Sequence, residues 1–230
     1  MGFELDSVQL GVTDLDSSRS DYEVLFGVAP VLVGRERVRF QLAHGGIELE
    51  IGAPAVQSLR FVTSNSNDLT SWPQGAAAFH GLTVFTGMQE GTLRHVVAPR
   101  DGVESIDHVV IQSPDLQRAR TLWSDQLGIR LALDREFPAR GLRMLFFRSA
   151  GMTLEFVGAL HPRGETTGPD ALYGLAYTVA DLAACRDRLR AGGVDVSEIR
   201  PGQKRGTIVA TVRSRTAGVP TLLIQDKAGP

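Results

Sequence analysis

The sequence predicts an α+β protein made of four β-α-β-β-β units. An internal repeat is the main evidence, because residues 6–32 align with residues 107–133 without a gap. A further copy of the pattern begins at residue 173, and a degenerate copy begins at residue 58. Every copy carries an Asp-Leu pair after a run of strand-forming residues, which is typical of a strand followed by the start of a helix.

The copy that begins at residue 107 shows the unit most clearly. Residues 108–113, HVVIQS, are a β-branched run that predicts a strand. In the helix start that follows, Ser113 is the expected cap, Pro114 suits the first position and Asp115 favours the helix dipole. Apolar residues then recur at helical spacing up to Gly128, which suits a helix C-terminus. The remaining strands are expected over 129–133, 142–147 and 152–157.

The other copies divide the chain into two domains. The first copy closes with an expected strand at 46–51, and the last copy closes with one at 221–225. In the second copy, Trp72 and Pro73 interrupt the helical pattern, so a short or broken helix is expected there. Residues 98–105 are polar and rich in turn formers, as in a linker. We therefore expect domains at 1–100, with a degenerate second unit, and at 106–230.

Composition restricts the class of partner. The net charge is −2 and no long basic or acidic run occurs, which argues against a nucleic-acid or membrane-surface partner. A small-molecule ligand is the expected partner, with the chain as a monomer or homodimer. The single cysteine, Cys185, allows no intrachain disulfide and reads as a core residue, and no signal-peptide pattern occurs, so a cytoplasmic location is expected.

Three motifs carry a resemblance to a known family. D-H-V-V-I with S-P-D-L (107–116), L-G-I (127–129) and T-L-E-F-V (153–157) resemble the vicinal oxygen chelate superfamily, which includes glyoxalase I, bleomycin-resistance proteins, methylmalonyl-CoA epimerase and extradiol dioxygenases. The resemblance implies that two units pair into a partly open barrel around a pocket, so four units imply two glyoxalase-like open barrels. It does not imply one reaction, because this fold hosts several classes of enzyme and also binding proteins.

The resemblance also implies where metal ligands would lie, on the first and last strands of each unit. In the second domain these positions are His108, Glu155, Gly174 and Gln225. Glycine offers no donor atom, so His108, Glu155 and Gln225 are only a remnant of a ligand set. The sequence thus predicts no bound cofactor and no tightly bound metal, while a divalent metal stays open as the alternative.

In the first domain the corresponding positions are Ser7, Glu50, Phe61 and a last position near His95. This set is poorer still, because serine and phenylalanine replace the expected donors. The sequence leaves open whether the first domain retains a pocket.

His108 and Glu155 are the candidate catalytic pair. A histidine titrates near neutral pH, and a neighbouring carboxylate can fix its tautomer, so the pair suits general acid–base chemistry. The alternative is a histidine retained only for packing inside the barrel.

Four further residues are candidates for the ligand pocket. Gly174 and Ala176 would leave space for a ligand ring, and Gln225 lies at the end of the last strand. Arg143 could bind an anionic ligand at the barrel mouth, although a solvated strand edge explains it equally well. The basic loop 200–207 is a candidate lid, and such loops are more often plain hairpin connections.

The function expected from the sequence is binding of a small organic ligand in an apolar pocket of the second barrel, with an incomplete metal site. Whether the protein is an enzyme stays open. The alternative is a metal-dependent lyase or isomerase, or an extradiol-type dioxygenase, with an unusual ligand set.

Overall fold

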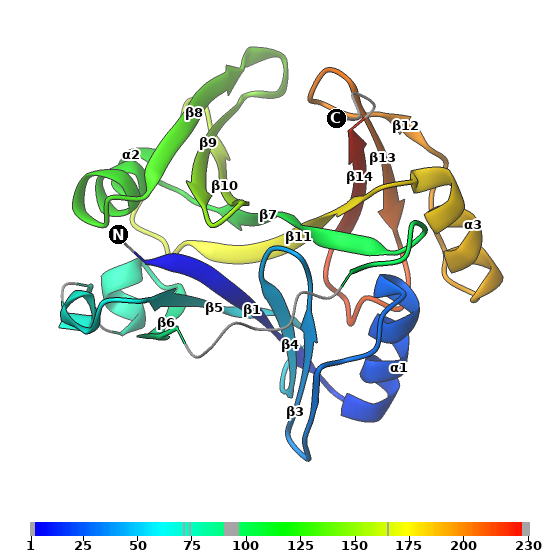
Figure 1. Ribbon diagram of the computed structural model, residues 1–230. Helices are drawn as coiled ribbons and strands as arrows, with labels where there is room; N and C mark the ends of the chain where they lie inside the picture. Colours follow the sequence, from blue (N-terminus) through cyan, green and yellow to red (C-terminus); the bar gives the residue numbers. More distant parts are fainter. Residues whose placement is uncertain (1–2, 71, 74, 90–96, 165, 227–230) are drawn as a thin grey trace.

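The computed structural model describes residues 3–70, 72–73, 75–89, 97–164 and 166–226. Two mixed sheets dominate it, one of six strands in the order β2-β3-β4-β1-β5-β6 and one of eight in the order β12-β13-β14-β11-β7-β10-β9-β8. Figure 1 shows the larger sheet curved into an open cup, with α2 and α3 on its outside and the smaller sheet below it. The predicted α+β class is confirmed.

The smaller sheet and its helices come from the first part of the chain. Their elements are β1 (Glu4–Val12), α1 (Leu15–Phe26), β2 (Leu32–Val33), β3 (Arg37–Gln41), β4 (Gly46–Ile51), β5 (Ala55–Thr63), the 3-10 segments η1 (Ser66–Thr70) and η2 (Ala76–Phe79), and β6 (Thr83–Met88).

The larger sheet comes from the second part. Its elements are β7 (Val103–Gln112), α2 (Leu116–Arg120), the π-helical turn η3 (Thr121–Gln126), β8 (Arg130–Phe137), the 3-10 turn η4 (Pro138–Arg140), β9 (Leu142–Ser149), β10 (Met152–Ala159), β11 (Ala171–Val179), α3 (Leu182–Ala191), β12 (Arg200–Pro201), β13 (Thr207–Val212) and β14 (Thr221–Asp226).

Strand pairing reproduces the repeat. The first strand of a unit pairs in parallel with its last strand, as in β1–β4, β7–β10 and β11–β14. Two units join through their first strands, which pair antiparallel in β1–β5 and β7–β11. The second unit is reduced: among its described residues, β5 and β6 pair in parallel and only 3-10 segments connect them. The expected broken helix is confirmed.

The repeated Asp-Leu pair marks the helix starts. Asp14, Asp115 and Asp181 are the N-caps, and each side chain accepts from the backbone N–H three residues later. The expectation that Ser113 caps the second helix is therefore wrong. Its hydroxyl instead accepts from the N–H of Asp115, at 3.2 Å.

One apolar core joins the two sheets. Trp123 is fully buried, and its ring centroid lies 5.8 Å from that of Phe61 on β5 and 5.7 Å from that of Phe156 on β10. Tyr177 of β11 is fully buried against Phe26 of α1. Cys185 is also fully buried, as expected of a core residue. None of the helices in the described residues has the length and apolar character needed to cross a membrane.

Candidate functional site

The eight-stranded sheet has a buried outer face and a partly accessible inner face. Val109 and Ile111 of β7 are fully buried on the outer face, whereas His108 and Val110 are partly exposed. Paired residues on neighbouring strands share a face. Because Val110 is paired with Glu155, the candidate pair lies together on the inner face.

A β-bulge adds a residue to this site that the sequence pattern did not indicate. The register between β7 and β11 shifts at Asp107, so Asp107 and His108 both reach the same side of the sheet. The Asp107 carboxylate lies 2.6 Å from Nδ1 of His108, and Nε2 of His108 lies 3.7 Å from Oε2 of Glu155. The imidazole therefore sits between two carboxyl groups, in ion-pair contact with Glu155 but without a direct hydrogen bond to it.

Electrostatics couple the three groups. Burial by itself lowers the pKa of His108, but the hydrogen bond to Asp107 and the charges of Glu155 and Asp107 outweigh it, so the pKa is raised. Burial raises the pKa of Glu155, and the charge of His108 offsets only part of that rise. Burial also raises the pKa of Asp107, but the hydrogen bond and charge of His108 and the charges of Arg148 and Lys204 lower it overall. The site thus favours a charged imidazole beside a carboxyl that holds its proton unusually well.

The raised pKa of His108 predicts a pH dependence of stability. A pKa that is higher in the folded state contributes stability below the unfolded value of 6.5, and that stability is lost as the pH rises through the folded value. We expect the free energy of unfolding to fall as the pH rises above about 6.5, and to fall less in His108→Gln. Urea unfolding at a series of pH values from about pH 6 upward measures both slopes. Equal slopes in the two proteins would show that His108 does not carry the effect.

Two candidate pocket residues are placed elsewhere by the structure. The amide oxygen of Gln225 accepts from the backbone N–H of Leu182 at 2.9 Å, so this side chain serves the start of α3. Arg143 is paired with Gly158 on the outer face, and its guanidinium binds Asp134 at 2.6 and 2.8 Å, a contact that raises the pKa of Arg143. Neither residue lies beside His108, and both placements correct the sequence-based expectation.

Gly174 and Ala176 do share the inner face, because they are paired with Val110 and His108. Gly174 does not open space for a ligand ring, and Ala176 is fully buried. A Cβ atom on Gly174 would lie 2.7 Å from the carbonyl oxygen of Pro220, so the neighbouring chain fills that position.

Strand register also corrects the ligand position on the last strand. Ala176 on β11 is the counterpart of Val110 on β7, because each lies two residues after the first-strand ligand position of its unit. Glu155 is paired with Val110, and Leu222 is paired with Ala176. Leu222, and not Gln225, therefore corresponds to Glu155. The four ligand positions then hold His108, Glu155, a glycine and a leucine. Catalytic metal sites normally have three protein ligands, and the described residues form no metal-binding group of three or more His, Cys, Asp or Glu. These residues do not fit a catalytic metal.

The first sheet places different residues at its equivalent positions. Ser7 is paired with Gly46, as His108 is paired with Thr153. Glu48 lies two residues after Gly46, as Glu155 lies two residues after Thr153. Glu48 therefore corresponds to Glu155, and Glu50 does not. By the same comparison, the first-strand ligand position of the second unit is Ser58 and not Phe61. The last-strand ligand position of that unit is Phe85. His95, near which that position was expected, lies outside the described residues. Strand register, which a sequence alignment does not specify, decides these positions.

An arginine occupies the centre of this first-sheet site. Arg39 binds Glu48 at 2.7 Å and Asp6 at 3.2 Å, and Asp6 corresponds to Asp107. In each sheet, a nitrogen-containing side chain thus lies between an aspartate at a β-bulge and a glutamate on the last strand of the unit. In the first sheet this side chain is an arginine, which is always charged. In the second sheet it is a histidine, whose charge changes with pH.

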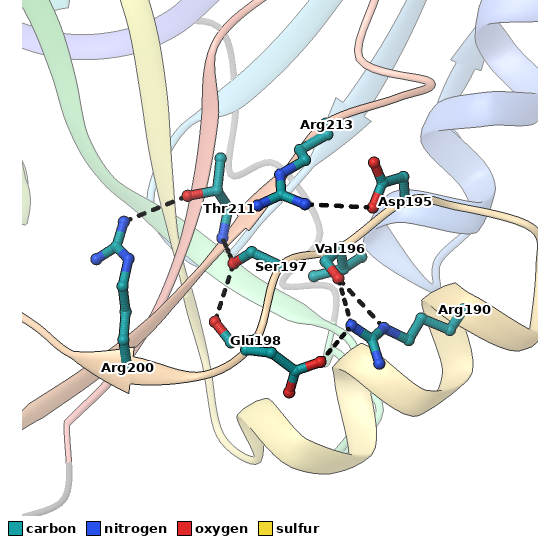
Figure 2. Close-up of a pocket in the computed structure, with 8 residues that line it drawn as sticks. All are labelled: Arg190, Asp195, Val196, Ser197, Glu198, Arg200, Thr211 and Arg213. Atoms are coloured by element: carbon teal, nitrogen blue, oxygen red, sulfur yellow. Dashed lines mark hydrogen bonds and ion pairs between the residues drawn. The ribbon is translucent and has the colours of Figure 1, made fainter.

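Two surface recesses lie away from His108. One, of about 520 Å³, is on the first sheet and is lined by Gln9, Glu50, Ile51, Gln57, Ser58, Thr83 and Phe85. The other, of about 550 Å³, lies beside α3, β12 and β13 (Figure 2). In it Arg190 binds Glu198 at 3.0 Å and Arg213 lies 3.8 Å from Asp195, so its charges are largely paired internally.

The paired units and their inner-face positions define a vicinal oxygen chelate fold. Residues 107–211 match the model of the Glyoxalase/Bleomycin resistance protein/Dioxygenase superfamily. An ethylmalonyl-CoA/methylmalonyl-CoA epimerase of Cereibacter sphaeroides is 28% identical over 100 residues, which cover 40% of this chain and 72% of the epimerase.

A solved glyoxalase structure has the same fold. The Mn(II)-bound glyoxalase from Novosphingobium aromaticivorans superposes with a TM-score of 0.72 at 18% identity, over 97% of this chain and 82% of its own. The methylmalonyl-CoA epimerase from Mycobacterium tuberculosis gives a TM-score of 0.48 at 24% identity, over 59% of this chain and 95% of its own. At these identities the likeness describes architecture alone.

Proposed function

We propose that the inner face of the eight-stranded sheet binds a small organic ligand, and that Asp107, His108 and Glu155 move a proton on it without a catalytic metal. The observation that carries the proposal is the imidazole held at 2.6 Å by Asp107 and at 3.7 Å from Glu155. General acid–base catalysis requires such groups within reach of one another, with pKa values moved toward neutrality.

Each residue has a defined role in this proposal. Glu155, whose pKa burial raises, is the group that takes a proton from the ligand or returns it. His108 stabilises the Glu155 carboxylate and can exchange a proton with it, and Asp107 holds the ring orientation through Nδ1. Val110 and Phe146, the cross-strand neighbours of Glu155, give the site an apolar border. Proton transfer next to a carbonyl is the reaction class that this set suits.

The relative of known activity is consistent with this class. The Cereibacter sphaeroides protein is named as an epimerase of ethylmalonyl-CoA and methylmalonyl-CoA. Inverting a carbon centre next to a carbonyl needs a proton removed and returned, which is acid–base chemistry. The present site differs from a metal-assisted one, because Gly174 and Leu222 stand where two further ligands would be.

The test is exchange of carbon-bound protons in D2O, followed by NMR, on a panel of 2-oxo acids and 2-substituted malonyl thioesters. We expect at least one compound to exchange at a rate that EDTA does not change and that Glu155→Gln lowers by about a hundredfold or more. Glu50→Gln is the matched control, because Glu50 lies on the first sheet.

Two other outcomes would replace the proposal. Exchange that EDTA abolishes and Mn²⁺ restores would favour the metal-dependent alternative. Ligand binding without exchange by any compound, weakened in His108→Ala, would favour a binding protein.

A further inference from the structure

Two arginines face each other across neighbouring antiparallel strands of the inner face. Arg130 of β8 is paired directly with Arg148 of β9, and both are exposed. Within the described residues, neither lies in ion-pair contact with a carboxylate. Like charges directly opposite each other on antiparallel strands are destabilising. The pair is therefore an arrangement that an anion between or beside the two guanidinium groups would stabilise.

The arginine pair continues the row of residues that contains His108. Arg148 is paired with Thr153, and Thr153 is paired with His108. The guanidinium of Arg148 donates to the hydroxyl of Thr153 at 2.7 Å, which holds it over the strand next to His108. Neighbouring strands are about 4.8 Å apart. Arg148 is two strands away from His108, and its guanidinium reaches over the strand that lies between them. The charge of Arg148 also reaches this site, since it lowers the pKa of Asp107.

Several other cations of this sheet have carboxylate partners. Lys204 lies 2.6 Å from Asp226, and Arg143 is bound by Asp134. In the groove in Figure 2, Arg190 and Arg213 face carboxylates of their own. Arg130 and Arg148 differ from these residues because each faces another arginine.

We infer that Arg130 and Arg148 bind the anionic group of the ligand, a carboxylate or a phosphate, and that the inner face takes a small organic anion. Guanidinium groups match the geometry of both anions through paired hydrogen bonds. The anion site rests on the arginine pair itself. The further step, that the bound anion presents its reactive carbon to Glu155, rests on the proposed function.

The experiment is isothermal titration calorimetry at constant ionic strength with three probes: malonate, inorganic phosphate and uncharged malonamide. We expect an anion to bind and malonamide not to bind, and the tighter of the two anions identifies the group recognised. Arg148→Met should weaken binding by about tenfold or more, and Arg130→Met by several-fold. Arg148→Lys keeps the charge but loses the fork, so it should fall between wild type and Arg148→Met. Arg213→Met, the matched control in the groove of Figure 2, should change affinity by less than about twofold.

Three results would overturn the inference. They are equal binding of malonate and malonamide, no binding of either anion, and a loss of binding in Arg213→Met as large as in Arg148→Met. Thermal melting of each variant shows that it is folded. Glu155→Gln separates the two proposals, because it should stop proton exchange and leave anion binding intact. If exchange fails in the wild type while the anion still binds at Arg148, only the proposed function falls.

Discussion

Replacing Arg39 with methionine is expected to lower the free energy of unfolding by about 3 kcal/mol. Arg39 bridges Asp6 and Glu48 on the first sheet, and the side chains of Arg39, Asp6 and Glu48 are only 13%, 17% and 9% exposed. Removing the guanidinium leaves two carboxylates partly desolvated and close together. Breaking such an ion pair from one side costs more than its net contribution, because Asp6 loses its cation and Glu48 keeps only Arg37, which is 47% exposed.

Urea unfolding at pH 7 measures the effect, and Arg37→Met is the matched control. Arg37 lies 3.3 Å from the same glutamate but is 47% exposed, so its loss should cost less than about 1 kcal/mol. Adding Glu48→Gln to Arg39→Met should recover part of the stability, because it removes one unpaired charge. If the two arginine variants lose the same stability, the buried cluster does not act as described.

The repeat predicted the architecture because its signals are local. The Asp-Leu pair recurs wherever an aspartate caps a helix, and the strand-forming run before it is readable without knowledge of the partner strand. The interrupted pattern at Trp72 and Pro73 also predicted the 3-10 segments of the second unit. That His108 and Glu155 share a face followed instead from the resemblance, which puts ligand positions on the first and last strands of each unit.

The rest of the site depends on strand register, which local signals do not specify. A bulge of one residue brings Asp107 to the side of His108, although simple alternation puts adjacent residues on opposite faces. A shift along β14 exchanges Gln225 for Leu222. Strand register also moved the first-sheet positions from Glu50 to Glu48 and from Phe61 to Ser58. In each case the pairing partner on another strand decides the outcome.

Substitutions at His108 and Glu155 are expected to be strongly coupled. Their side chains are 15% and 14% exposed, so either group would lose a partner in a largely desolvated place if the other were removed. Each of His108→Ala and Glu155→Gln should cost about 1–3 kcal/mol of unfolding free energy, as for an unsatisfied buried group. In the double variant neither group is left unpaired, so its loss should be clearly smaller than the sum.

The double-mutant cycle of His108→Ala and Glu155→Gln, measured by urea unfolding at pH 7, tests the central claim most directly. The account predicts a coupling free energy of about 1 kcal/mol or more between the two residues. Additive losses, with a coupling free energy near zero, would contradict it, because His108 and Glu155 would then not form one site.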